Sequence, residues 1–332
     1  MLCRYSQYGW SKQAICRKWD MSIKTFYAFK RDIPAKLDRR RGIQLNKITP
    51  KEKTTVCAYA LLHSDLRHRE MAYKMIDEDV AYISPSSVYR ILKAEHLIPI
   101  RQRRIKPDNW NPHQIPGQAD QIWQSDLTYI QYHRLNYYLL LFLDVYSRFI
   151  VHWQLCTQMT GATVTYAFKE ALRQTGQHPI LQTDNGSCFL SHEFKTLLSK
   201  EHIEHHLIHP SCPNENAEIE RANRTIKDNL YPEDAESFEQ LYRIVKERIH
   251  YYNHQRYHSG IGFITPYVKY RGNPDKIFEQ RKQKLQRAKK QRIKTNWIKL
   301  KEQKETRTKN EFKPNIYSEP LNKKNNECLN FV

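Results

Sequence analysis

Three acidic residues occupy positions in predicted strands, turns and helices where a carboxylate suggests a chemical role. Asp126 lies inside the strand-like run WQSDLTYI, where an inward-facing acid is costly unless it binds something. Asp184 follows the strand-like ILQT and opens the turn DNGS, which predicts that its carboxylate lies at the edge of a sheet. Glu220 lies on the predicted helix NENAEIERANRTIK, and 35 residues separate it from Asp184.

Oxygen ligands of this kind suit one type of chemistry. Acids that come from separate elements and meet at one end of a sheet can hold Mg²⁺. Two such ions about 4 Å apart can activate a water or hydroxyl and stabilise the leaving oxygen of a phosphodiester. Asp126, Asp184 and Glu220 are therefore the candidate ligands of a two-ion site.

The helix that carries Glu220 places further polar side chains beside it. Asn216, Asn223, Arg224 and Lys227 lie at i−4, i+3, i+4 and i+7, on the same helix face. This pattern is typical of a metal-ligand carboxylate flanked by phosphate-contacting side chains. An exposed helix with internal ion pairs is the alternative, and the pairing with Asp126 and Asp184 favours the first interpretation.

Other residues compete for a chemical role. Glu218 is a rival for Glu220, but it leaves only 33 intervening residues and lies about 160° away around the helix. His202, His205, His206 and His209 suggest zinc, yet a strand would put successive histidines on opposite faces, which disfavours a shared metal. The seven cysteines are scattered without a C-x-x-C pair, which excludes a disulfide scaffold and fits a reducing compartment.

The middle of the chain supplies the elements that must position these residues. Alternating and apolar runs predict a mixed α/β sheet covered by helices. Strands are expected at 121–130, 137–150, 151–156, 179–183 and 204–208, and HRLN (133–136) is expected to be a hairpin turn. Helices are expected at 163–175, 191–201, 216–230 and 238–254.

The segments on either side read as DNA-binding units. Residues 1–46 and 47–98 each predict a helix-turn-helix, with 22–30 and the helix opened by Ser84-Pro85 facing the DNA groove. The expected DNA contacts are Lys24, Lys30, Ser86, Ser87 and Arg90. Residues 99–119 predict a linker, 120–274 the catalytic core, and 275–332 a basic tail that is helical near its start and disordered beyond.

Charge is distributed unevenly along the 332 residues. The net charge is +13 for residues 1–106, −3 for 107–274 and +10 for 275–332, which makes +20 in total. Two basic arms that flank a neutral centre indicate a polyanionic partner, most commonly nucleic acid. No apolar run approaches the roughly 18 residues needed to cross a bilayer, and the stretch MLCRYSQYGW has no apolar core of signal-peptide type, so we expect a cytoplasmic protein.

Taken together, the motifs resemble a known family. WQSDLTYI, LQTDNGSCF, HPSCPNENAEIERANRTIK and YNHQRYHSGIGFITPYVKY are similar to the integrase core of retroviral-type transposases encoded by bacterial insertion sequences. The order Asp, Asp, 35 residues, Glu matches that family's signature. The resemblance covers residues 120–270 closely and the upstream helix pairs more loosely.

The resemblance implies fold, cofactor and activity. It implies a ribonuclease-H-like α/β core with Asp126, Asp184 and Glu220 as catalytic triad on two Mg²⁺, for which Mn²⁺ can substitute. It implies a homo-oligomer that binds double-stranded DNA at the element ends, cleaves the 3′ ends and joins them to target DNA, associated with the bacterial nucleoid. Asp144 has a counterpart in the family without a metal role, so we expect it to bond within a turn, to Ser147 or Arg148.

Two other function classes remain open on the sequence alone. One is an inactive or regulatory DNA-binding protein, which the intact acidic residues disfavour. The other is a ribonuclease-H-like nuclease or resolvase, which shares the metal site but seldom carries two upstream DNA-reading units. The chain starts a few residues before its first helix pair, which leaves room for a contribution from an upstream reading frame.

Overall fold

The structure, a computed structural model, describes residues 11–18, 45–98, 116–133, 135–209, 213–228 and 230–311. It divides into two compact units, one of residues 51–286 and the other of residues 1–50 and 287–332. The larger unit holds the sheet and the candidate site. The domain boundaries expected from the sequence remain predictions.

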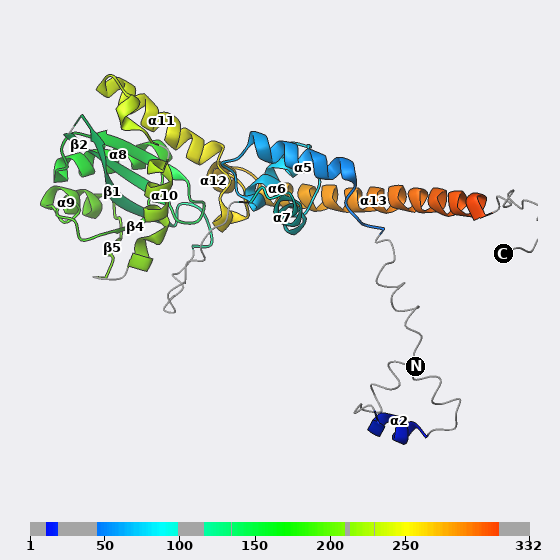
Figure 1. The fold of residues 1–332 in the computed structure, drawn as a ribbon. Coiled ribbons are helices and arrows are strands. Elements are labelled where there is room, and N and C mark those ends of the chain that lie inside the picture. Colours follow the sequence, from blue (N-terminus) through cyan, green and yellow to red (C-terminus); the bar gives the residue numbers. More distant parts are fainter. Residues whose placement is uncertain are drawn as a thin grey trace, which may run out of the picture. The chain divides into compact units, whose positions relative to one another are not determined.

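The larger unit contains a five-stranded mixed sheet (Figure 1). Its strands are β1 (Ile122–Tyr132), β2 (Leu135–Asp144), β3 (Ile150–Cys156), β4 (Ile180–Thr183) and β5 (His205–Leu207), in the order β3-β2-β1-β4-β5. The β1–β2 and β2–β3 pairs are antiparallel, whereas β1–β4 and β4–β5 are parallel. The mixed sheet predicted from the sequence is therefore confirmed.

Helices cover both faces of this sheet. α8 (Gly161–Thr175) and α9 (His192–Lys200) pack with Leu140 and Phe142 of β2 in one core. α10 (Ala217–Lys227) and α11 (Phe238–His254) pack with Leu139 and Leu141 in the other. Because both faces of β2 are buried, its sequence is a continuous apolar run rather than an alternating one. This strand order with helices on both faces is the ribonuclease-H-like arrangement, as expected.

The second expected strand is shorter than its apolar sequence suggests. We predicted a strand over 137–150, but β2 starts at Leu135 and ends at Asp144. The Asp144 carboxylate accepts a hydrogen bond from Ser147 N at 2.8 Å, and Arg148 adopts a left-handed φ of 66°. These local bonds turn the chain, so β3 begins only at Ile150.

Three helices precede the sheet in the same unit. They are α5 (Pro50–Leu62), α6 (His68–Asp77) and α7 (Pro85–Ala94), with Ser84 as the N-cap residue of α7. Val56, Met75 and Val88, one from each helix, are fully buried. The expected helix pair in this segment is thus present as α6 and α7.

The segment after α11 closes the larger unit. It contains η3 (Ser259–Ile261), α12 (Pro266–Arg271) and the beginning of α13 (Pro274–Glu311). Arg281 of α13 is 4% exposed and donates two hydrogen bonds to the Asp77 carboxylate, at 2.8 and 2.6 Å. Tyr257 donates a third, at 2.7 Å. The three groups fasten α6 to the end of the core; we call them the Asp77 clasp.

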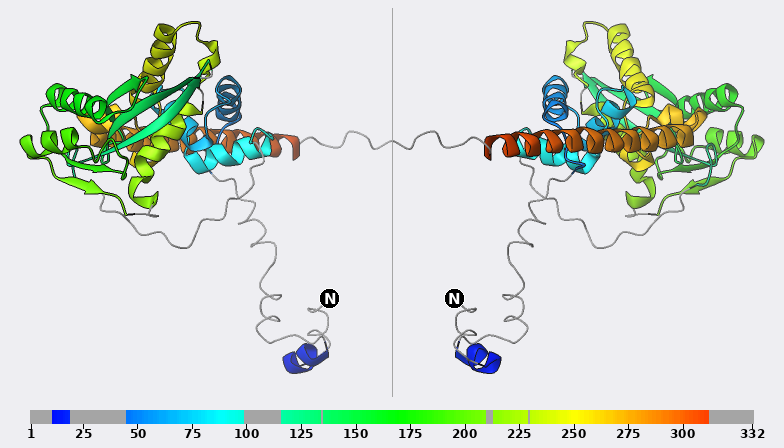
Figure 2. Two further views of the ribbon diagram at one scale, coloured as in Figure 1. Left: turned by 90° about the vertical axis from the view of Figure 1, so that its left-hand side faces the viewer. Right: turned by 90° about the vertical axis from the view of Figure 1, so that its right-hand side faces the viewer.

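The short 3₁₀ helices η1 (Pro213–Asn216) and η2 (Pro232–Asp234) lie on either side of α10 in the sequence. α13 is one uninterrupted helix (Figure 2), consistent with the absence of Gly and Pro between 275 and 311. The helix expected at the start of the basic tail therefore continues to Glu311. Residues 312–332 lie outside the described residues.

The smaller unit is described in part. Its α2 (Lys12–Lys18) follows Ser11, whose Oγ accepts a hydrogen bond from Ala14 N at 3.2 Å, as expected of an N-cap. The expected second helix with Lys24 and Lys30, and linker residues 99–115, lie outside the described residues. In the same unit, Asn296 of α13 donates to Leu45 O at 2.7 Å and Lys47 O at 2.9 Å. Within the described part of the chain, no helix is both long and apolar enough to span a membrane.

Candidate active site

Strand register brings two of the predicted acids level with each other. β1 and β4 run parallel with Ser125 opposite Thr183. The next residue on each side is Asp126 and Asp184, respectively. Neighbouring strands lie about 4.8 Å apart, so the two acids come from adjacent backbone positions at the point where β4 ends.

A tight turn after β4 holds Asp184 in place. Its Oδ1 accepts a hydrogen bond from Gly186 N at 3.0 Å. A Cβ on residue 186 would lie 2.9 Å from that same oxygen, so glycine leaves room for the carboxylate. Asn185 donates from Nδ2 to Ile208 O at 3.1 Å, which ties the turn to the chain after β5.

Helix α10 brings the third acid across the sheet. Asn223 Nδ2 donates to Asp126 Oδ2 at 2.8 Å, and Lys227 Nζ donates to Thr128 Oγ1 at 3.2 Å. Asn223 is buried, while Glu220 and Arg224 are exposed. The helix therefore lies along β1 with Glu220 accessible to solvent.

The pKa of Asp126 is affected by the charges of the other two acids. Burial is the main cause that raises the pKa of Asp126 to about 6, and the charges of Asp184 and Glu220 contribute to the same rise. Hydrogen bonds from Leu127 N and the Asn223 amide act in the opposite direction. The structure thus gathers Asp126, Asp184 and Glu220 into one interacting group, which a bound cation would stabilise.

The donor set fits a hard divalent cation. It consists of carboxylate oxygens, and among the described residues Asn216 Oδ1, at the end of η1, and Asn223 Oδ1, on α10, are buried without a hydrogen-bond partner. Across the described ranges no three His, Cys, Asp or Glu side chains are close enough to hold an ion as they stand. Like charges repel without a cation.

Glu218, the rival to Glu220, faces elsewhere. Its Oε1 lies 3.1 Å from Arg148 Nη1, and both side chains are nearly buried. Burial lowers the pKa of Arg148 to about 10. Glu218 thus forms an ion pair with the turn between β2 and β3, away from the acidic group.

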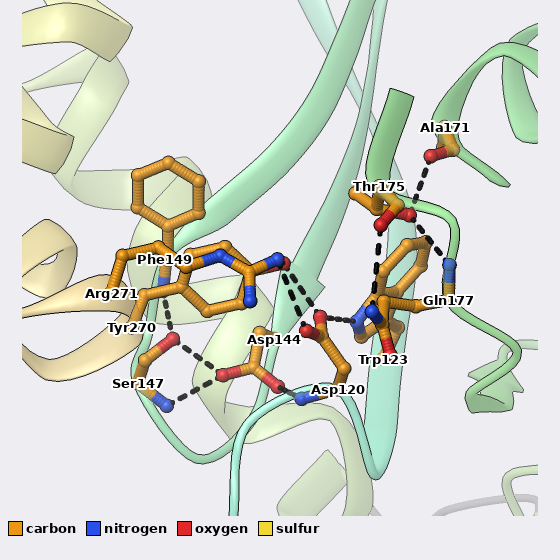
Figure 3. Close-up of polar contacts among 10 residues, drawn as sticks. All are labelled: Asp120, Trp123, Asp144, Ser147, Phe149, Ala171, Thr175, Gln177, Tyr270 and Arg271. Atoms are coloured by element: carbon orange, nitrogen blue, oxygen red, sulfur yellow. Dashed lines mark hydrogen bonds and ion pairs between the residues drawn. The ribbon is translucent and has the colours of Figure 1, made fainter. Parts of the chain in front are cut away.

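Asp144 belongs to a separate hydrogen-bonded network at the start of β1 (Figure 3). Its carboxylate accepts bonds from Ser147 N, Ser147 Oγ and Asp120 N. Asp120 Oδ1 in turn accepts from Trp123 Nε1 at 3.1 Å and Tyr270 OH at 2.6 Å. The expectation that Asp144 bonds within a turn, to Ser147, is confirmed.

The histidine run disperses in the structure. His205 bonds to Thr183 Oγ1 at 2.9 Å, His206 to Glu204 Oε1 at 2.6 Å, and His209 to Glu215 Oε1 at 3.0 Å. These three histidines therefore bond to three different residues, Thr183, Glu204 and Glu215.

Of the predicted DNA-contacting residues of α7, Ser86 and Ser87 lie in its first turn and Arg90 lies one turn further along. Ser86 and Arg90 are exposed, and Arg90 donates to Ser86 O and Ser87 Oγ. Together with His68, Arg69 and other residues of α6 and α7, they line a hollow of about 470 Å³. Their contact with DNA remains a prediction.

Sequence reasoning missed two glutamines at this site. Gln124 is 1% exposed and bonds to Gln182, Glu215 O and Ile219 N. Gln124 precedes Asp126 by two residues and Gln182 precedes Asp184 by two. The repeated Gln-x-Asp of WQSD and LQTD was the available signal.

Comparison with known proteins gives two family matches and several relatives. Residues 116–213 and 201–266 match two family models, both described as an integrase core domain. A transposase for insertion sequence element IS904 from Lactococcus lactis is 28% identical over 154 residues, 44% of this chain and 60% of the relative. Transposase InsF for insertion sequence IS3A from Escherichia coli is 23% identical over 279 residues, 78% of this chain and 94% of the relative.

Viral proteins also match the core. A Gag-Pro-Pol polyprotein of human T-cell leukemia virus 3 is 33% identical over 106 residues, 32% of this chain and 7% of the polyprotein. The HTLV-2 integrase catalytic core domain, solved in complex with magnesium, is 25% identical with a TM-score of 0.40 and covers 46% of this chain and 98% of that one. The match covers 60% of the IS904 transposase and 7% of the polyprotein, which is less than two thirds of the length of either relative.

The strand order, the acidic group and both family matches define a protein with an integrase core domain. The matched residues contain Asp126, Asp184 and Glu220. Over these residues the chain is similar to integrase cores and to transposases of bacterial insertion sequences.

Proposed function

We propose that the protein is a transposase that binds the ends of its own insertion sequence, cleaves the 3′ ends and joins them to target DNA. One observation carries the proposal: acids from β1, from the turn after β4 and from α10 interact as a single group. Its metal-dependent chemistry would be hydrolysis followed by transesterification of phosphodiesters.

Asp126, Asp184 and Glu220 are the residues that would hold two Mg²⁺ ions, or Mn²⁺ in their place. When bound, such ions activate the attacking oxygen and stabilise the leaving one. Asn223 keeps the Asp126 carboxylate oriented through its bond to Oδ2. Arg224 and Lys227 supply positive charge beside the acidic group, where the DNA backbone would lie.

The two steps balance without an energy source. In the first, water attacks the phosphodiester at the element end and breaks the bond to the 3′ oxygen, leaving a free 3′ hydroxyl. In the second, that hydroxyl attacks a target phosphodiester, so one P–O bond forms as another breaks. Neither ATP nor a covalent protein intermediate is required.

DNA recognition is assigned to the basic segments on either side of the core. Ser86, Ser87 and Arg90 on α7, with Lys24 and Lys30 nearer the start of the chain, are the proposed contacts in the grooves. The two basic arms add sequence-independent affinity for the backbone. We propose a homo-oligomer on DNA, because two element ends must be processed together, and a site of action on the bacterial nucleoid.

A strand-transfer assay with a pre-cut element end tests this function. The full-length protein with Mg²⁺ should join the end to target DNA, and Asp126→Asn, Asp184→Asn and Glu220→Gln should each abolish joining. A ribonuclease-H-like nuclease would cut without joining, and an inactive DNA-binding protein would do neither. Full activity in EDTA would contradict the metal mechanism.

A further inference from the structure

A single buried amide connects the three elements that carry the acidic residues. Gln124 lies on β1, two residues before Asp126 and on the same face of the strand. Its side chain reaches β4 on one side and the beginning of α10 on the other. Gln124 therefore touches every element of the candidate site without belonging to the acidic group.

All the bonds of this amide end close to an acidic residue. Nε2 donates to Gln182 Oε1 at 3.3 Å, and Gln182 precedes Asp184 by two residues. Nε2 also donates to Glu215 O at 2.8 Å, at the turn that leads into α10. Oε1 accepts from Ile219 N at 3.2 Å, and Ile219 directly precedes Glu220.

The bond to Ile219 does the work of a helix cap. The first backbone N–H groups of a helix have no partner within the helix, and α10 begins at Ala217. The N-cap residue of α10, Asn216, makes no side-chain cap bond. Gln124 therefore satisfies an amino-terminal N–H of α10 from the sheet, which couples the helix position to β1.

Only an amide performs all these roles at once. Two donors on Nε2 and one acceptor on Oε1 are in use, so a glutamate lacks the donors and a methionine lacks both functions. Mg²⁺ requires near-ideal octahedral geometry, which makes the spacing of its ligands critical. Changes in groups that orient metal ligands typically reduce metal affinity or activity by 10–100-fold.

We propose that Gln124 is a positioning residue that sets the spacing of Asp126, Asp184 and Glu220 for metal binding. The inference rests on the proposed function, since it concerns the same acidic group. Gln124 touches neither the ions nor the DNA. It acts through β4 and α10, and its loss should weaken Mg²⁺ binding more than a general loss of stability would.

Asn253 provides a matched control. It is another buried amide, 5% exposed, and it bonds to Ile150 N at 2.9 Å and Ile150 O at 3.0 Å. These bonds join α11 to β3, neither of which carries an acidic residue of the site. Gln124→Met and Asn253→Leu each remove a buried amide while keeping side-chain size.

The experiment measures the thermal unfolding temperature of the full-length protein at increasing Mg²⁺ concentrations. Gln124→Met should raise the Mg²⁺ concentration for half-maximal stabilisation by about 10–100-fold. Asn253→Leu should leave that concentration within about twofold of wild type, although both variants unfold at lower temperature. Equal Mg²⁺ responses in the two variants, shifted or unshifted, would overturn the inference.

A second variant keeps the test decisive if Gln124→Met does not fold. Gln182→Met removes only the link to β4 and should raise the half-maximal concentration by a smaller factor, about threefold or more. An unchanged half-maximal Mg²⁺ concentration in Gln182→Met would show that the link to β4 does not affect metal binding, and it would overturn the proposal that Gln124 acts through both β4 and α10. If Asp126→Asn responds to Mg²⁺ as wild type does, the proposed metal site itself fails, and that outcome differs from failure of the Gln124 role alone.

Discussion

Asn223 donates a 2.8 Å hydrogen bond from Nδ2 to the Oδ2 atom of Asp126, across 97 positions of sequence. The bond turns a residue that the sequence assigned to DNA contact inward, toward a carboxylate. It stabilises the ionised form of Asp126, yet burial dominates and raises the pKa of this residue to about 6. The acid is held in place by α10 but remains costly to ionise.

A pH-dependent stability follows from this balance. The pKa of Asp126 rises from 3.8 to about 6 on folding, so the folded state binds a proton more tightly than the unfolded state. Without metal, the free energy of unfolding should therefore fall by about 3 kcal/mol as pH rises from about 4 to about 6. Asp126→Asn should lack this contribution. Urea unfolding in EDTA across that range compares the two proteins, and identical pH profiles would refute the assignment.

Glu218→Gln should separate stability from activity on α10. Glu218 and Arg148 form a nearly buried pair, and removing one charge should destabilise the protein by about 3 kcal/mol. The acidic group is untouched, so joining activity at a permissive temperature should remain within about twofold of wild type. Glu220→Gln should show the reverse: little change in unfolding temperature and more than about a 100-fold loss of joining. If Glu218→Gln lost activity while Glu220→Gln kept it, the third ligand would be Glu218.

Gly186→Ala should impair chemistry more than stability. The new Cβ would lie 2.9 Å from Asp184 Oδ1, so the carboxylate would have to move. A displacement near 1 Å can reduce the rate by about 100-fold, whereas a side-chain shift of this kind costs little stability. Single-turnover joining and thermal unfolding measure the two effects. Gly117→Ala is the control, because the nearest atom to its Cβ is 4.0 Å away.

Arg281→Met should open the Asp77 clasp. Arg281 also donates to Gly262 O at 3.0 Å and Phe263 O at 2.7 Å, so its loss removes the donor to both carbonyls and leaves Asp77 with the Tyr257 hydrogen bond but without its cation. Breaking one partner of a buried pair costs about 3–5 kcal/mol. Lys282→Met, which removes an exposed pair with Glu279 at 3.6 Å, should cost less than about 1 kcal/mol. Denaturant unfolding of both variants decides this, and equal effects would argue against the clasp.

Arg90→Met should reduce discrimination between element ends and unrelated DNA. Arg90 is exposed in the middle of α7, the helix proposed to face the groove. Loss of a base contact costs about 1–3 kcal/mol of specificity, so the ratio of the two dissociation constants should fall by about 5-fold to 150-fold. Lys93→Met, at the other end of α7, should weaken binding to both DNAs alike. Binding titrations at fixed salt provide the ratio, and an unchanged ratio in Arg90→Met would remove α7 from recognition.

Much of the fold and the choice of acids follow from local sequence. Apolar periodicity identified the sheet strands and the helices around them, because a period of two or 3.6 residues is set by backbone geometry. Ser11 marks a helix start for an equally local reason, since its side chain bonds within the first turn of the helix. The 35-residue spacing between Asp184 and Glu220 is also visible in the sequence alone.

Hydrophobic periodicity was insufficient where the chain turns inside an apolar run. The apolar run after Leu135 reads as one strand to Ile150, but the Asp144 carboxylate ends it by bonding to Ser147. No periodicity distinguishes an acid that turns the chain from one that continues a strand. Burial of Asp144, which comes from packing against distant elements, makes that bond strong.

Tertiary structure alone decided which polar side chains meet. Asn223 and Asp126, Gln124 and Ile219, and Arg281 and Asp77 are 97, 95 and 204 positions apart. Each pairing depends on the angle at which a helix crosses its neighbour. Tertiary packing determines that angle to within a fraction of a helical turn, whereas the spacing of residues in the sequence does not. The residues capable of chemistry were therefore readable from the sequence. Their orienting partners became visible only once α10 lay on the sheet.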